Sequence, residues 1–477
     1  MNKIRTRFAP SPTGFLHVGS LRTALFAWLM AKQNNGDFIL RIEDTDKSRE
    51  VEGSIEHIIK SLKALGLNYN EGPDIKGPYG PYRQSDRLDI YKEWAMKLVD
   101  KGRAYSEIYS EEELQNFRNE AKQSKEPFLY RNFRPKKLNG YKEGQALRFK
   151  SEPKEYLYND LIYGDLKTPK EAIDDFIILK SDGYPTYNFA HIIDDYLMKI
   201  THIIRSSEFL ASVPKFLNLY EALEIDPPKM ATAPAVLGPD GKKKLSKRDN
   251  AKDILEYLNE GYLKDALISF MATLGWNDGT RQEIFSVDQL IQKFSINKVQ
   301  RSPANFDEKR LLYINGYLIR NLDLDELQVL SKSFWPKEAQ NYQESYQRKV
   351  LALIQERLKY LGEIEALSLF FFKELDVNKN LIKDNNKLRE FTNEQIIKML
   401  EASLEVLLES DFEVDDLQLK LNDLLQKLNQ KPAILFSLIR IATTQSPSSP
   451  GLFETLNLLG KDRSLNRIKQ QISALNN

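Results

Sequence analysis

The sequence contains no cysteine among its 477 residues, which excludes disulfides, thiolate metal sites and cysteine nucleophiles. Only four histidines are present, so we expect no metal site made by protein side chains. The longest apolar run, residues 24–31, is too short to cross a bilayer, and the first residues lead into no secretory signal. We therefore expect a cytoplasmic protein with no membrane partner.

An excess of charge of either sign is also missing. The chain carries 69 basic and 68 acidic side chains, for a net charge of +1. A strongly basic balance would have indicated a nucleic-acid partner, but local basic patches remain compatible with one. The length predicts two to four domains.

The first part of the chain alternates strand and helix patterns. Residues 4–9 and 38–43 are strand-like, and residues 21–32 and 51–67 have helical spacing. This order is typical of a parallel sheet of the Rossmann kind.

Gly and Pro concentrate in residues 72–81, which we interpret as a domain exit. Residues 190–196 and 200–205 are expected to return to the sheet, and the chain beyond residue 250 is mainly helical. We predict an α/β Rossmann-like catalytic domain with an inserted α+β connective domain, followed by an all-α C-terminal region. The predicted segments are 1–80 and 185–240 for the two catalytic halves, 81–184 for the insertion, 241–319 for a helical stem-contact domain, and 320–477 for the C-terminal helices.

The first candidate motif is APSPTGFLHVGS, residues 9–20, between a strand and a helix. A helix N-terminus offers unpaired N–H groups to a phosphate, Gly19 allows close approach, and His17 can donate to a phosphate oxygen. Alternatively, Ser20 caps the helix and the histidine is incidental.

The second motif is KKKLSKR, residues 242–248, which follows the turn sequence GPDG. Lysines in such a loop can offset the charge of a departing pyrophosphate, although a solvated basic loop is the common alternative.

Together the two motifs resemble the signatures of class I aminoacyl-tRNA synthetases, with Ser20 and Arg248 replacing the general residues as in the glutamyl and glutaminyl branch. The resemblance to bacterial glutamyl-tRNA synthetases extends over nearly the whole chain. Further matching segments are RIEDTD (41–46), GPYRQS (80–85), DGYPTY (182–187), IDD (193–195), RSSE (205–208), residues 306–317 and PGLF (450–453).

The resemblance implies ATP-dependent ligation of glutamate to tRNA(Glu) through glutamyl-adenylate, with Mg²⁺ accompanying ATP. It implies the catalytic residues His17, Lys244 and Lys247. The implied glutamate contacts are Arg7, Ala9, Ser11, Glu43, Tyr187, Arg205 and His191, the last replacing an asparagine of some members. The implied ATP contacts are Pro10, Ser11, His17, Gly19, Ser20, Glu208, Leu237, Lys244, Ser246 and Lys247.

Some members bind zinc through cysteines in the insertion, and residues 104–109 here contain none, so we expect no zinc. Basic residues of the insertion could meet tRNA phosphates or simply be solvated: Arg131, Arg134, Lys136 and Lys137. Arg357 matches an arginine that reads the anticodon.

Several alternatives remain open: an enzyme that also charges tRNA(Gln), a glutaminyl-tRNA synthetase, whose anticodon region is typically built from β-barrels, and an inactive tRNA-binding paralogue. We expect a monomer.

Overall fold

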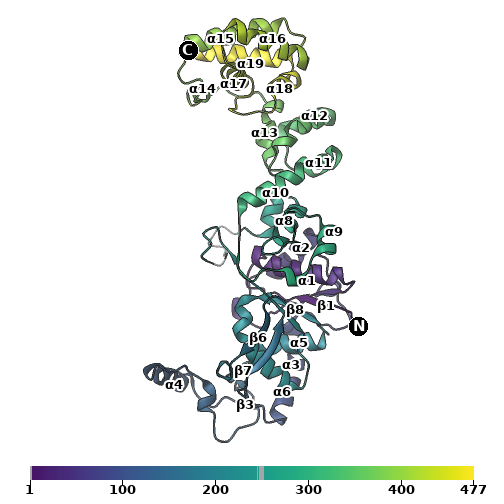
Figure 1. The fold of residues 1–477 in the computed structure, drawn as a ribbon, viewed down its shortest axis with the longest axis vertical. Helices are drawn as coiled ribbons and strands as arrows, with labels where there is room; N and C mark the ends of the chain where they lie inside the picture. The colour runs from purple at the N-terminus through teal and green to yellow at the C-terminus, as the bar shows by residue number, and fades with distance from the viewer. Residues whose placement is uncertain (1–2, 244, 246–251, 477) are drawn as a thin grey trace. The chain divides into compact units, whose positions relative to one another are not determined.

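A computed structural model describes residues 3–243, 245 and 252–476 of the chain. The chain forms two compact units, Met1–Leu258 with Lys264–Leu311, and Asn259–Leu263 with Leu312–Asn477 (Figure 1). Each unit has its own buried apolar core. The predicted five-segment division of the chain stays a prediction.

The first unit opens with a β–α–β arrangement, as predicted. Strands β1 (Arg5–Phe8) and β2 (Asp37–Leu40) pair in parallel, joined by helix α1 (Val18–Gln33). β1 also lies beside β8 (His202–Ser206), where the Thr201 N–H donates to the Arg5 carbonyl at 2.9 Å. The carboxyl ends of β1 and β8 therefore lie near the start of α1, where parallel sheets place their ligand sites.

The second half of this fold corrects one prediction. β8 pairs in parallel with β9 (Lys229–Ala233), but residues 190–196 lie in helix α5 (Tyr187–Leu197) and not in a strand. All residues from Phe189 to Asp195 are buried. Seven successive buried residues leave this part of the helix no solvent-exposed face, and a short run with that burial resembles a buried strand in the sequence.

Residues 81–184, the segment predicted as an insertion, contain a three-stranded antiparallel sheet and also contribute two strands to the sheet of β8 and β9. The antiparallel sheet has the order β3-β4-β7, and the hairpin of β5 and β6 adds to the order β6-β5-β9-β8. The bounds are α3 (Leu88–Asp100), β3 (Ala104–Ser106), α4 (Glu111–Gln123), β4 (Leu147–Phe149), β5 (Tyr156–Asp160), β6 (Gly164–Thr168) and β7 (Phe176–Leu179). The hairpin's place was not predicted, because the parallel pairing of β5 with β9 joins residues distant in sequence.

Glu107 is a shared hydrogen-bond acceptor within residues 81–184. Its carboxylate accepts hydrogen bonds from the Tyr130 hydroxyl at 2.5 Å and from Arg148 Nε at 3.0 Å. Arg134, a candidate for tRNA phosphates, instead pairs with Asp175, with 2.6 Å between its Nε and the carboxylate. These side chains connect the strands internally, and the charge of Arg134 is already neutralised.

Among its described residues, the first unit also contains five further α-helices, a separate two-stranded sheet of β10 and β11, and the first residues of α10, which continues into the second unit. They are α2 (Ser54–Ala64), α6 (Val213–Leu223), β10 (Val236–Leu237), α7 (Ile254–Asn259), α8 (Lys264–Ala272), α9 (Val287–Lys293), β11 (Ala304–Asn305) and α10 (Glu308–Arg320).

The second unit is helical over its described residues, as predicted. Its further helices are α11 (Leu324–Ser331), α12 (Glu344–Ile354), α13 (Glu363–Phe372), α14 (Asn380–Lys383), α15 (Asn393–Leu408), α16 (Val414–Lys427), α17 (Pro432–Thr444), α18 (Leu452–Leu459) and α19 (Lys461–Asn476). Leucines with helical spacing, such as Leu417 and Leu421, are buried in this unit.

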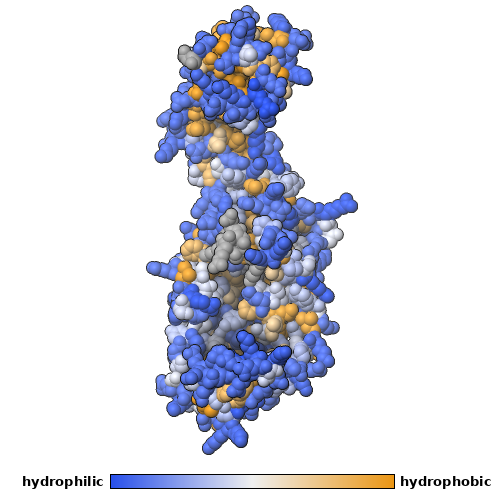
Figure 2. All heavy atoms as spheres, turned by 90° about the vertical axis from the view of Figure 1, so that its left-hand side faces the viewer, coloured by the Kyte–Doolittle hydropathy of each residue, from blue (hydrophilic) through white to orange (hydrophobic). Residues whose placement is uncertain are grey.

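On the face in Figure 2, hydrophilic residues predominate and apolar residues form small separate groups. Across the described part of the chain, no helix is long and apolar enough to span a bilayer.

Candidate active site

A cavity of about 560 Å³ opens where β1, α1, β8 and the chain after β9 meet. Residues predicted for two different substrates line it together, although they come from distant parts of the sequence. The predicted residues along its wall are Arg7, Ala9, Pro10, Ser11, His17, Gly19, Ser20, Glu43, Tyr187, Arg205 and Glu208. One cavity therefore brings together the residues predicted to contact the amino acid and those predicted to contact the nucleotide.

His17 caps the N-terminus of α1. Its Nδ1 accepts a hydrogen bond from the Gly19 N–H at 3.2 Å, and its Nε2 lies 3.3 Å from the Ser20 hydroxyl. Because Nδ1 accepts, a neutral His17 carries its proton on Nε2. A Cβ on Gly19 would lie only 3.3 Å from the imidazole Cε1, so the glycine makes room for this histidine.

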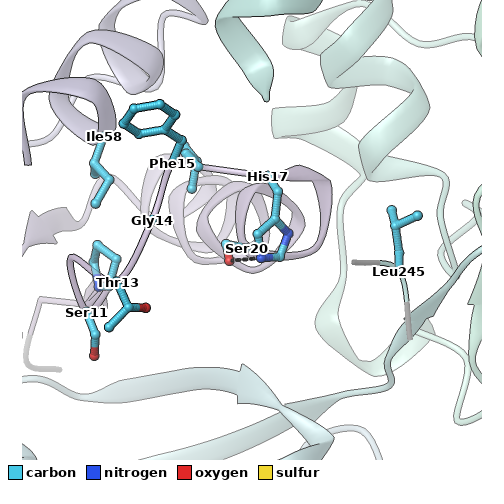
Figure 3. Close-up of a pocket in the computed structure, with 10 residues that line it drawn as sticks. Ser11, Thr13, Gly14, Phe15, His17, Ser20, Ile58 and Leu245 are labelled. Atoms are coloured by element: carbon cyan, nitrogen blue, oxygen red, sulfur yellow. Dashed lines mark hydrogen bonds between the residues drawn. The ribbon is translucent and has the colours of Figure 1, made fainter. Parts of the chain in front are cut away.

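A second cavity, of about 370 Å³, adjoins this helix start. In Figure 3, Phe15 and Ile58 lie on one side of it and Leu245 on the opposite side, with His17 and Ser20 between them. Leu245 N donates to the Val236 carbonyl at 2.9 Å. This bond joins Leu245 of the lysine-rich segment to β10 (Val236–Leu237), and Leu245 lines both cavities together with His17.

Buried ion pairs connect the two predicted ends of the amino-acid site. Arg41 Nη2 lies 2.8 Å from Glu43 Oε1, and Arg41 Nη1 lies 2.7 Å from Asp195 Oδ1. Asp195 also accepts from Arg7 Nε at 3.1 Å. Burial opposes ionisation of Asp195, but the charges of Arg41 and Arg7 prevail and lower its pKa.

Glu43 responds in the opposite direction, since burial raises its pKa despite the charges of Arg41 and Arg7. A carboxylate that remains poorly solvated in an open cavity has much to gain from an incoming ammonium group.

Arg205 is the unpaired cation of this end of the cavity. It is 4% exposed, and its Nε and Nη1 atoms have no hydrogen-bond partner among the described residues. Among the described residues, its Nη2 donates to the sulfur of Met230 at 3.2 Å, and the guanidinium lies over the Phe216 ring, 5.1 Å from the centroid. A buried guanidinium without a counterion is costly, so this position favours an anionic ligand.

His191 lies behind the cavity wall. It is fully buried and stacks on Tyr187, with 4.7 Å between ring centroids. Its Nδ1 lies 2.7 Å from the Tyr187 carbonyl, which fixes the proton on Nδ1. Burial lowers the His191 pKa to about 3, so the ring is neutral. His191 does not line the cavity itself; it packs against Tyr187, which does.

Some predicted residues lie elsewhere. Leu237 is not among the residues along either cavity, and its carbonyl accepts from the Phe306 N–H at 2.9 Å. Lys244, Ser246 and Lys247 lie outside the described residues. Arg357 belongs to the second unit, at the end of a short 3₁₀ turn, Gln355–Arg357.

Sequence reasoning missed other residues of the wall, including Arg22, Thr13 and Phe209. Arg22 follows Gly19 by three positions, so helical spacing alone could have placed both on one face of α1. Phe209 packs on Tyr187 with 5.1 Å between ring centroids, a contact for which the sequence carries no signal.

Comparison with known families accounts for both units. Residues 3–313 match the family of class I tRNA synthetases (E and Q), catalytic domain, and residues 326–472 match an anticodon binding domain. The chain is 41% identical over 481 residues to a glutamate–tRNA ligase of Dehalococcoides mccartyi, which covers 99% of this chain and 98% of the relative.

The chain belongs to the glutamate–tRNA ligases, a family of class I aminoacyl-tRNA synthetases. A ligase of Clostridium kluyveri is 39% identical, with 100% of this chain and 99% of the relative covered. The crystal structure of a glutamate tRNA ligase from Elizabethkingia meningosepticum in complex with its amino acid has a TM-score of 0.86. Its identity is 32%, with 99% of this chain and 100% of that chain covered.

The enzyme ligates glutamate to tRNA with ATP as a substrate. Its helical second unit matches the anticodon domain, which confirms the prediction of a helical anticodon-binding region.

Proposed function

We propose that the 560 Å³ cavity binds glutamate against Arg205 and Glu43, and ATP against His17 and the start of α1. The observation that carries this assignment is Arg205, a buried guanidinium with no carboxylate partner in the described part of the chain. The γ-carboxylate of glutamate supplies that partner. Arg7 contributes less directly, because Asp195 already neutralises it.

The charges at this end of the cavity favour glutamate over glutamine. Three buried carboxylates, Glu43, Asp194 and Asp195, pair with Arg41, Arg7 and Arg87. Arg205 has no such carboxylate partner among the described residues. Glutamate has a net charge of −1 and balances the Arg205 charge, whereas neutral glutamine leaves the buried cation unpaired.

In the proposed activation step, the α-carboxylate of glutamate attacks the α-phosphate of ATP and pyrophosphate leaves. The Nε2 proton of His17 and the N-terminus of α1 stabilise the phosphate charge, and Lys244 and Lys247 meet the departing pyrophosphate. No three described His, Asp or Glu side chains form a metal-holding group, so the proposed Mg²⁺ would be held mainly by phosphate oxygens. No zinc enters the proposal.

The tRNA specificity rests on the second unit. We propose that Arg357 contacts the anticodon, together with Arg440. Burial first, and the charge of Arg357 second, lower the Arg440 pKa, and Arg440 Nε donates to the Ser449 hydroxyl at 2.8 Å. Two nearby like charges repel each other, and a polyanionic partner would offset that repulsion.

The deciding experiment is aminoacylation of purified tRNA(Glu) and tRNA(Gln) with labelled glutamate. We expect charging of tRNA(Glu) by the parent enzyme, and an Arg357→Gln variant with weaker discrimination between the two tRNAs. Equal charging of both tRNAs by the parent would favour the enzyme of wider range. No charging of either would favour the inactive paralogue and contradict the proposal.

The proposal includes three further expectations, on the role of residues 81–184, on the oligomeric state and on the location of the enzyme. The insertion, residues 81–184, acts at the tRNA acceptor end, the enzyme works as a monomer, and it acts in the cytoplasm, where charged tRNA is consumed. Light scattering of the purified chain with and without tRNA tests the oligomeric state.

A further inference from the structure

Arg22 is a second buried arginine in the wall of the same cavity, on the nucleotide side. It lies in the first half of α1 and is 3% exposed. No described carboxylate pairs with it, and its Nε atom has no hydrogen-bond partner among the described residues. Neither the two sequence motifs nor the proposed contacts include it.

The guanidinium of Arg22 joins three distant segments of the chain. Its Nη2 donates to the carbonyl of Pro234, in the connection between β9 and β10, and its Nη1 donates to the carbonyl of Leu274 at 3.0 Å. Pro234, Ala235 and Val236 line the same cavity as Gly19 of α1. One side chain thus fixes the spacing between the two walls that face the nucleotide.

The charge of Arg22 strengthens its hydrogen bonds to both carbonyls. Burial alone lowers the Arg22 pKa to about 10, so the group remains a cation at neutral pH. Hydrogen bonds from a charged donor to carbonyl oxygens are about twice as strong as neutral ones. With no acid nearby, the two carbonyls provide the compensation for the buried charge, and a bound triphosphate would add to it.

We propose that Arg22 is a positioning residue for ATP, which holds the Pro234–Val236 wall against the turn of α1 that carries Gly19. This inference rests on the proposed assignment of the cavity. It predicts a selective defect: loss of Arg22 weakens ATP binding more than glutamate binding, because neither the Arg205 nor the Glu43 side chain is hydrogen-bonded to Arg22 or Pro234 among the described residues.

The test uses Arg22→Lys in the full-length enzyme, measured by ATP–pyrophosphate exchange with tRNA present. Lysine keeps the charge, but its single ammonium cannot reproduce the two separate Nη donors. We expect the KM for ATP to rise about tenfold and the KM for glutamate to stay within about twofold. Arg22→Gln, which removes the buried charge, is the second variant should the lysine prevent folding.

The matched control is Arg205→Lys, another buried arginine of the same wall, which should raise the KM for glutamate and not that for ATP. The inference is wrong if a folded Arg22 variant keeps the parent KM for ATP, or if both KM values rise by the same factor. A normal KM for glutamate in Arg205→Lys would instead overturn the glutamate assignment and leave the Arg22 result standing.

Discussion

Arg41 Nη1 lies 2.7 Å from Asp195 Oδ1, and neither side chain is accessible to solvent. Asp195 also binds Arg7, and Arg41 also binds Glu43, so a continuous set of ion pairs joins Arg7 and Glu43, which both line the cavity. The residues that would touch glutamate are therefore held by residues that would not.

Replacing Asp195 with asparagine should destabilise the enzyme strongly, because Arg7 and Arg41 both lose their shared counterion. Breaking a buried ion pair on one side costs about 3–5 kcal/mol. Chemical denaturation of Asp195→Asn measures this loss. Glu93→Gln is the control, since the Glu93–Lys97 pair is exposed and should change the free energy of unfolding by less than about 1 kcal/mol. Equal effects would contradict the account of the network.

Replacing Arg205 with glutamine should lower kcat/KM for glutamate about 100-fold, equivalent to about 3 kcal/mol, because a charged hydrogen-bonded pair is lost. Competition between glutamate and glutamine in ATP–pyrophosphate exchange should show a reduced preference for glutamate. Arg7→Gln should reduce that preference less, since Asp195 already pairs with Arg7. The reverse order of the two variants would assign the γ-carboxylate to Arg7.

Two substitutions of His17 should separate its capping role from its catalytic role. Asparagine is a favourable N-cap and alanine is not, so only His17→Ala should lose about 1 kcal/mol of stability. Both should slow ATP–pyrophosphate exchange by at least about 100-fold, because neither carries the imidazole N–H toward the phosphates. Near-parent exchange in His17→Asn would limit His17 to capping.

His191 should make stability depend on pH in a defined direction. Burial lowers its pKa to about 3 in the folded enzyme, against about 6.5 for an ordinary histidine, so below pH 6.5 the unfolded chain takes up a proton that the folded chain does not. The folded enzyme is therefore most stable, as far as His191 is concerned, above pH 6.5. It loses free energy of unfolding as the pH falls below that value. Between pH 7 and 5, the parent should lose about 2 kcal/mol more than His191→Asn.

The control for this pH effect is His202→Asn, because His202 is only partly buried and burial with the Lys229 charge lowers its pKa. Its removal should change the pH dependence less. The loss of unfolding free energy between pH 7 and pH 5 is measured by urea unfolding. An equal loss in the parent and in His191→Asn would show that burial does not hold His191 neutral.

The sequence by itself determined the β–α–β start of the first unit and the helical nature of the second. Local patterns suffice for these elements: strand and helix periodicity identified β1, α1 and β2, and leucine spacing identified the helical second unit. The reaction followed from the resemblance to a family, carried by the two motifs and the matching segments. The motif around His17 and the matching segments brought together Arg7, Glu43, Tyr187 and Arg205, which the cavity does bring together.

Only the tertiary structure decided which of those charges are free. Asp195 neutralises Arg7 while Arg205 stays unpaired, a difference set by which side chains meet across 188 positions of sequence separation. The helical state of residues 190–196, the place of the β5–β6 hairpin and the two carbonyls bound by Arg22 have the same origin. Each depends on burial and on long-range contacts, and local sequence patterns carry no record of either.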